Sequence, residues 1–69
     1  MRIGEALKKA RESKGLTQAQ LAERLFVDTS LICRWEKGQR NVTLCQLEVI
    51  LGALDMTFAE LKRLENVDE

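Results

Sequence analysis

The chain has 69 residues, 45% of them hydrophobic, which is enough for one small core. Because a chain of this size buries only about 60% of the surface that its unfolded form exposes, a large ligand cavity beside the core is excluded. Proline is absent, aromatic residues make up only 4% of the sequence, and helix-forming residue types dominate. This composition favours a single all-α domain over residues 1–69 and disfavours a β-sandwich.

The charges are unevenly distributed along the chain, although the formal net charge is zero. Residues 1–15 contain five basic and two acidic side chains, whereas residues 42–69 contain two basic and six acidic ones. Such a split suits a protein that turns one side toward a polyanion and its acidic part away from it.

Several functional classes are disfavoured by what the sequence lacks. Cys33 and Cys45 are its two cysteines and histidine is absent, so we expect free thiols and no metal site. No glycine-rich phosphate loop or serine–base pair is present, so we expect no catalytic residues, no enzyme activity and no cofactor. The longest apolar run, Val49–Leu54, is far below the roughly 20 residues of a membrane helix. We therefore expect a cytoplasmic protein that contacts no membrane and binds no small-molecule ligand.

The first two predicted helices lie in the basic part of the chain. The first spans residues 2–13, where apolar residues recur at helical spacing, and Gly15 is expected to end it in the left-handed conformation. The second begins at Thr17, because Thr17 and Gln20 form the pattern of a capping box, and it ends near Leu25.

Three more helices are predicted from the same kinds of signal. The third spans residues 29–37, with Asp28 as its N-cap and Gly38 after its end. The fourth and fifth begin at capping boxes that start with Thr43 and Thr57. The residues predicted to be buried are Leu44, Leu47, Ile50, Leu51 and Leu54 in the fourth helix, and Leu61 and Leu64 in the fifth.

The predicted third helix has two different sides. At about 100° per residue, one side carries Leu31, Ile32 and Trp35, and the other carries hydroxyls, a thiol and cations. Short hydroxyl residues allow close approach to the major groove of DNA, and an arginine further along can bond to guanine. The alternative is an ordinary solvated surface helix. A short capped helix followed by a connection of only residues 26–28 is, however, typical of a helix-turn-helix.

Together these segments resemble the Cro and phage-repressor type of helix-turn-helix domain, called Xre-like, over residues 3–64. The residues that carry the resemblance are RESKGLTQ at 11–18, LAE at 21–23, ICRWEKG at 32–38, and the helix at 43–54. The resemblance implies a five-helix lambda-repressor-like fold and a homodimeric transcription regulator that binds a two-fold double-stranded DNA operator. The segment at 40–44 and the brief C-terminal end also resemble the controller proteins of restriction–modification systems.

The resemblance also implies roles for individual residues. Those expected to contact base edges are Thr29, Ser30, Cys33 and Arg34, and those expected to contact the DNA backbone are Gln18, Lys37, Arg40 and Asn41. Arg11 and Glu36 are expected to form an internal salt bridge that orients the third helix; without the resemblance they would be interpreted as solvated charges.

Two positions depart from the family pattern. Phe26 occupies a turn position usually taken by glycine, and a bulky residue in the left-handed conformation is unfavourable by about 1 kcal/mol or more. Either the turn is rearranged, or Phe26 makes a contact, or it is a tolerated and partly buried substitution. Asp55 takes another usual glycine position, and aspartate tolerates the left-handed region better.

A homodimer needs a second apolar surface. The candidates are Val49 and Ala53 on the fourth helix and Phe58 and Leu64 on the fifth, which we expect to form an isologous interface. The alternative is that these residues extend the core of a single chain.

Two further alternatives remain at this stage. The chain could be an antitoxin or another protein-interaction module, although an antitoxin usually carries a toxin-wrapping segment and little sequence follows the fifth helix. Cys33 could act as a redox switch of DNA binding if it faces the groove, or it could be an inert packed thiol.

Overall fold

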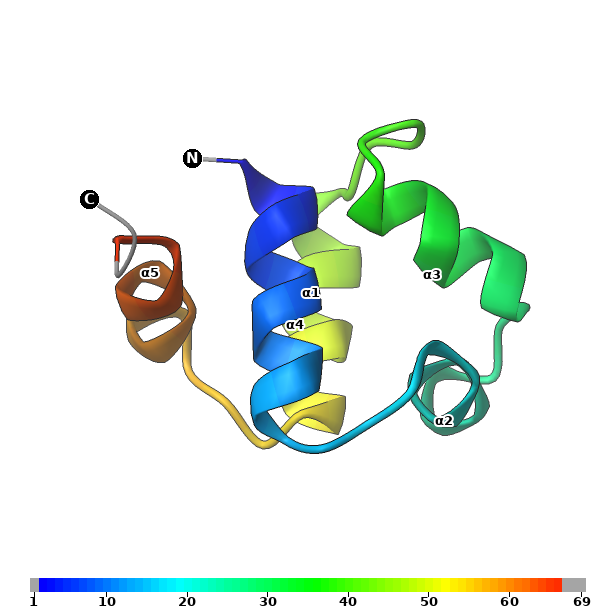
Figure 1. The fold of residues 1–69 in the computed structure, drawn as a ribbon, viewed down its shortest axis with the longest axis horizontal. Coiled ribbons are helices and arrows are strands. Elements are labelled where there is room, and N and C mark those ends of the chain that lie inside the picture. Colours follow the sequence, from blue (N-terminus) through cyan, green and yellow to red (C-terminus); the bar gives the residue numbers. More distant parts are fainter. Residues whose placement is uncertain (1, 67–69) are drawn as a thin grey trace.

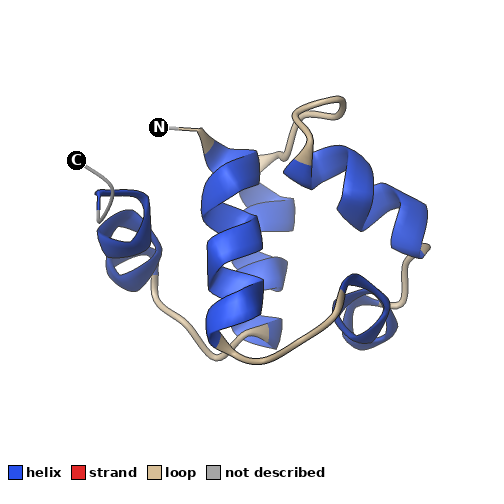
Figure 2. Ribbon diagram, viewed as in Figure 1, coloured by secondary structure: helices blue, strands red, loops and turns tan. Residues whose placement is uncertain are grey.

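The computed structural model describes residues 2–66, and this part of the chain folds into five helices without strands (Figures 1 and 2). Met1 and residues 67–69 of the expected domain lie outside the described residues. The helices are α1 (Ile3–Ser13), α2 (Gln18–Leu25), α3 (Thr29–Glu36), α4 (Leu44–Ala53) and α5 (Phe58–Asn66). The predicted all-α class is confirmed. None of the described helices is long and apolar enough to cross a membrane.

The helices pack around one core. Figure 1 shows α1 in front of α4 at the centre, with α5 on one side and the α2–α3 pair on the other. The packed pairs are α1 with α5, α2 with α3, α1 with α3, and α2 with α4. The buried apolar residues come from all five helices and from the position after α4: Ala6, Leu7, Ala10, Leu21, Ala22, Ile32, Trp35, Leu47, Ile50, Leu51, Leu54 and Leu61.

All three predicted capping boxes form. At the starts of α2 and α4, a threonine side chain accepts a hydrogen bond from the backbone N–H of the glutamine three residues later. The side chain of that glutamine accepts a hydrogen bond from the threonine backbone N–H. Thr57 and Glu60 exchange the same two bonds at the start of α5, at 3.0 and 3.2 Å. Asp28 is the N-cap of α3, as predicted, with an extended backbone, although its side chain makes no capping hydrogen bond.

The predicted left-handed positions at the helix ends are confirmed. Gly15 and Gly38 have φ values of 70° and 76°, and Asp55 has a φ of 53°. The third helix ends at Glu36, one residue earlier than predicted, with Lys37 as its C-cap.

Phe26 also adopts the left-handed conformation, with a φ of 58°. Its side chain is 94% exposed, so the interpretation of a partly buried substitution is wrong. The turn is not rearranged to avoid the strain. The backbone N–H of Phe26 donates to the carbonyl of Glu23, and the N–H of Val27 donates to that of Ala22, which ends α2.

Leu44 is the clearest error in the predicted core, since 72% of its surface is exposed. Its helical spacing from Leu47 and Leu51 is correct for a shared face. Leu44 is, however, the first residue of α4, and the elements that cover Leu47 do not extend over it. Helical periodicity predicts which side of a helix a residue occupies, but not whether another element of the fold covers that residue.

Gly4 allows the start of α1 to lie against the end of α3. A Cβ atom at this position would be 2.4 Å from the carbonyl oxygen of Trp35 and 2.8 Å from that of Glu36. Both oxygens belong to the backbone, so rotation of a side chain could not relieve the clash. The close approach fixes where the last turn of α3 lies relative to α1.

Candidate nucleic-acid interface

The α2–α3 pair has the geometry of a helix-turn-helix. The two helices pack against each other and are joined by residues 26–28. On the inner side of α3, Ile32 and Trp35 are almost fully buried, and Leu31 is half-buried against the core. The side of α3 that was predicted to be apolar therefore holds it to the rest of the domain.

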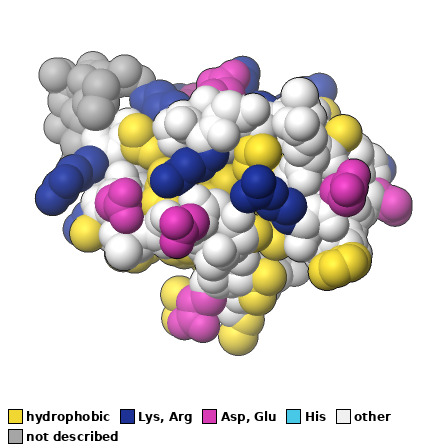
Figure 3. Space-filling model, turned by 90° about the horizontal axis from the view of Figure 1, so that it is seen from below, with side chains coloured by type: hydrophobic (Ala, Val, Ile, Leu, Met, Phe, Trp, Pro, Cys, Tyr) yellow, Lys and Arg dark blue, Asp and Glu magenta, His cyan; other side chains and the backbone are white. Residues whose placement is uncertain are grey.

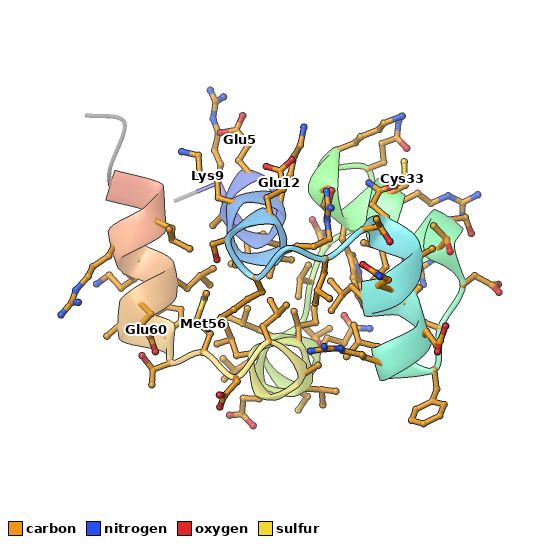
Figure 4. All side chains as sticks on the ribbon, turned by 60° about the horizontal axis from the view of Figure 1, so that its bottom comes forward. Glu5, Lys9, Glu12, Cys33, Met56 and Glu60 are labelled. Carbon is orange, nitrogen blue, oxygen red and sulfur yellow. The ribbon has the colours of Figure 1, made fainter. Side chains whose placement is uncertain are left out.

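The opposite side of α3 lies at the surface. Thr29, Ser30 and Arg34 are exposed, and Cys33 is half-buried. Figure 4 shows Cys33 on the side of α3 that faces away from α4. Both cysteines are free thiols, as predicted. All four residues expected to contact base edges thus share one solvent-facing side of a single helix.

The residues after α3 continue this surface. Lys37 at the C-cap and Arg40 and Asn41 in the following loop are all exposed. Gly38, the residue after the C-cap of α3, turns the chain in its left-handed conformation. Two cations and an amide therefore lie in the segment that leaves the exposed helix.

Arg11 and Glu36 form the ion pair that the resemblance implied, between α1 and the end of α3. Arg11 Nε lies 2.7 Å from Glu36 Oε2, and Arg11 Nη2 lies 3.1 Å from Oε1. Their side chains are only 9% and 4% exposed. Arg11 Nη1 also donates to the carbonyl of Leu16 at 2.7 Å, which fixes the loop between α1 and α2.

The contact with Glu36 favours the charged form of Arg11. The hydrogen bond to Glu36 raises the pKa of Arg11, and burial, which opposes this, does not outweigh it. A bidentate guanidinium–carboxylate pair has fixed relative orientation as well as attraction. It therefore holds α3 at a defined angle to α1.

Gln18 has a contact that the sequence did not predict. Its Nε2 donates to Glu36 Oε1 at 3.0 Å, and its side chain is half-buried. The expectation from the sequence was a phosphate contact alone. No local pattern connects these two positions, because α2 and the end of α3 meet only in the folded chain.

The expected dimer residues fall into two groups. Val49 and Phe58 are 61% and 48% exposed. Ala53 and Leu64 are half-buried and pack against the core, so they serve the single chain at least in part. Figure 3 shows the molecule from below, so α4, which lies behind α1 in Figure 1, comes toward the lower edge. Hydrophobic side chains are exposed toward that edge.

The geometry agrees with comparison to known proteins. The profile of the family described as "Helix-turn-helix" (HTH_3) matches residues 7–61, most of the chain. The chain belongs to this Xre-like helix-turn-helix family. The match includes α2, α3 and the turn between them, and with them the exposed side of α3.

Individual Xre-like proteins match over nearly the whole chain. The control protein C.MunI of Mycoplasma sp is 39% identical over 62 residues, covering 88% of this chain and 84% of that protein. The crystal structure of the restriction–modification controller protein C.AhdI from Aeromonas hydrophila superposes with a TM-score of 0.78 at 38% identity. That superposition covers 87% of this chain and 91% of the other.

A larger relative matches through one part only. The HTH-type transcriptional activator BcrR of Enterococcus faecalis is 38% identical over 61 residues, or 88% of this chain. The chain spans 30% of the length of BcrR. The similarity to the Xre-like family therefore concerns the helix-turn-helix domain, and the similar named proteins are regulators.

Proposed function

We propose that this protein is a sequence-specific transcription regulator that binds a two-fold operator in double-stranded DNA as a homodimer. The observation that carries the proposal is the exposed side of α3, where Thr29, Ser30 and Arg34 face solvent while Ile32 and Trp35 hold the helix in place. A rigidly held helix with short polar residues at its start is suited to insertion into the major groove.

Each group of residues has a distinct part in this proposal. Thr29 and Ser30 bond to base edges through their hydroxyls, and Arg34 bonds bidentately to a guanine. The Cys33 thiol lies beside them. Lys37, Arg40, Asn41 and Gln18 hold the DNA backbone and carry no sequence information themselves.

The homodimer is supported by the composition of α4. Of its ten residues only Gln46 and Glu48 are polar, so apolar residues extend beyond the side that packs on the core. A helix that is apolar over most of its circumference is normally buried over most of it. Val49, on the side of α4 away from the core, and Leu44, in its uncovered first turn, are exposed in the single chain, and a second copy related by a two-fold axis would cover them.

The test is DNA binding by fluorescence anisotropy, with a duplex from upstream of the protein's own gene and a scrambled duplex of equal composition. We expect tighter binding to the upstream duplex and a negative slope of log affinity against log salt concentration. Arg34→Ala should lower affinity for the upstream duplex by about tenfold or more and leave binding to the scrambled duplex nearly unchanged.

The matched control is Arg63→Ala, which removes an exposed arginine from α5 and should change neither affinity much. Absence of binding to the upstream duplex at low salt would overturn the proposal and favour a protein-interaction module. Equal losses for both arginine variants would show that charge alone, and not base contact by α3, is responsible.

A further inference from the structure

Glu36 connects three elements through one carboxylate. Its Oε1 accepts hydrogen bonds both from Arg11 on α1 and from Gln18 on α2, at 3.1 and 3.0 Å. Its Oε2 accepts a second bond from Arg11, at 2.7 Å. Glu36 is the last residue of α3, and Gln18 is the first residue of α2. The end of one helix of the helix-turn-helix is thus bonded to the beginning of the other.

This arrangement determines which atoms Gln18 presents to the outside. An ionised carboxylate accepts hydrogen bonds but cannot donate them, so Gln18 must turn its Nε2 and not its Oε1 toward Glu36. An amide nitrogen carries two hydrogens, and only one is needed for the bond to Glu36. The second N–H stays available on a side chain whose rotation is restricted.

We infer that Glu36 is a positioning residue for the phosphate contact of Gln18, so that this contact and the orientation of α3 form one energetic unit. The inference rests on the proposed DNA-binding function. Arg11 holds the carboxylate in place, the carboxylate holds the Gln18 amide, and the free N–H of that amide donates to a phosphate oxygen. A glutamine at position 36 would carry both an acceptor and a donor, so it would no longer determine which amide atom Gln18 turns outward, and the contribution of Gln18 to affinity would fall.

A double-mutant cycle tests this coupling. Gln18→Ala, Glu36→Gln and the double variant are compared with the unaltered protein for affinity to the upstream duplex by fluorescence anisotropy. Gln18→Ala should lower affinity about tenfold in the unaltered protein but less than about threefold in the Glu36→Gln background. Equal losses in both backgrounds would overturn the inference, because a merely structural role of Glu36 leaves the effect of Gln18 unchanged.

Arg40→Ala provides the matched control cycle. Arg40 is exposed in the loop after α3 and is also a proposed backbone contact, but it has no bond to Glu36 in the described part of the chain. Its loss of affinity should be the same in both backgrounds. Coupling of equal size for Arg40 would show that Glu36→Gln disturbs DNA binding generally, and this too would contradict the inference.

A second measurement does not require Glu36→Gln to fold. The ¹H–¹⁵N resonance of Arg11 Nε reports on the carboxylate, because Nε donates to Glu36 directly. It should shift when the duplex is added to the unaltered protein and shift much less in Gln18→Ala. If anisotropy shows binding but the Arg11 Nε resonance does not shift when DNA is added, the coupling is refuted and the proposed function is not. Failure of the unaltered protein to bind the duplex would instead refute the proposed function, and the inference with it.

Discussion

Phe26 combines two unfavourable properties at one residue. Its φ of 58° places a bulky side chain in the left-handed region, and its ring is 94% exposed, so that little burial offsets the strain. Asp55 has a similar φ, but aspartate tolerates this region better. The cost at Phe26 is therefore local and should be removable without changing the packing of the core.

Phe26→Gly should stabilise the fold by about 0.5 to 1 kcal/mol, because glycine adopts a positive φ without a steric penalty. The gain is smaller than the strain alone, since glycine also makes the unfolded chain more flexible. Thermal unfolding followed by circular dichroism should show a midpoint a few degrees higher. Phe26→Ala is the control, as it removes the ring but keeps Cβ, and it should show no comparable gain. Equal stabilisation by alanine would mean that ring exposure, not backbone strain, was the cost.

At the scale of the element, the helix starts were the most predictable part of the molecule. A capping box lies within four consecutive residues, so Thr17, Thr43 and Thr57 could be identified from local sequence alone. The exposure of Leu44 could not be predicted from local sequence, because it depends on which helices cover the first turn of α4. The bond between Gln18 and Glu36 likewise depends on the packing of two separate helices.

The capping box of α5 makes stability depend on pH. The backbone N–H and the hydroxyl of Thr57 both donate to the Glu60 carboxylate, and they lower the pKa of Glu60 from its ordinary value of 4.5. Because the pKa is lower in the folded chain, the stabilisation is fully present above pH 4.5. It is lost as the pH falls through the folded-state pKa.

The corresponding variant is Glu60→Gln, which keeps an acceptor oxygen but no charge. Urea unfolding followed by the fluorescence of Trp35, the single tryptophan, measures its stability at several pH values. The unaltered protein should be the more stable of the two at neutral pH, and the difference should shrink as the pH falls below 4.5. Glu23→Gln, an exposed change on α2, is the control. A difference that is constant with pH would contradict the assigned cause.

At the scale of the whole molecule, two surfaces carry the proposed function. The outward side of α3 is polar and exposed, and the inner side of the same helix packs on the core. On α4, two large apolar side chains are exposed, Leu44 at 72% in the first turn and Val49 at 61% on the side away from the core. Since one surface suits DNA and the other suits a second copy, both can be occupied at the same time.

Val49→Asp should convert the proposed dimer to a monomer, because a charge would be buried without a partner in the apolar interface. Sedimentation velocity at several concentrations measures the change. Ala19→Asp is the matched control, since it places the same charge at an exposed position on α2 and should leave the dimer intact. An unaltered protein that stays monomeric throughout, or a Val49→Asp variant that stays dimeric, would exclude this interface.

The network around Glu36 has an evolutionary consequence. The bonds that orient α3 are made by its last residue, whereas Thr29, Ser30 and Arg34 have no side-chain hydrogen bond to other residues within the described part of the chain. Substitutions at these exposed positions therefore leave the framework of the domain untouched. In a gene duplicate, operator preference could diverge one position at a time, each intermediate protein still folding and still holding its helix at the same angle.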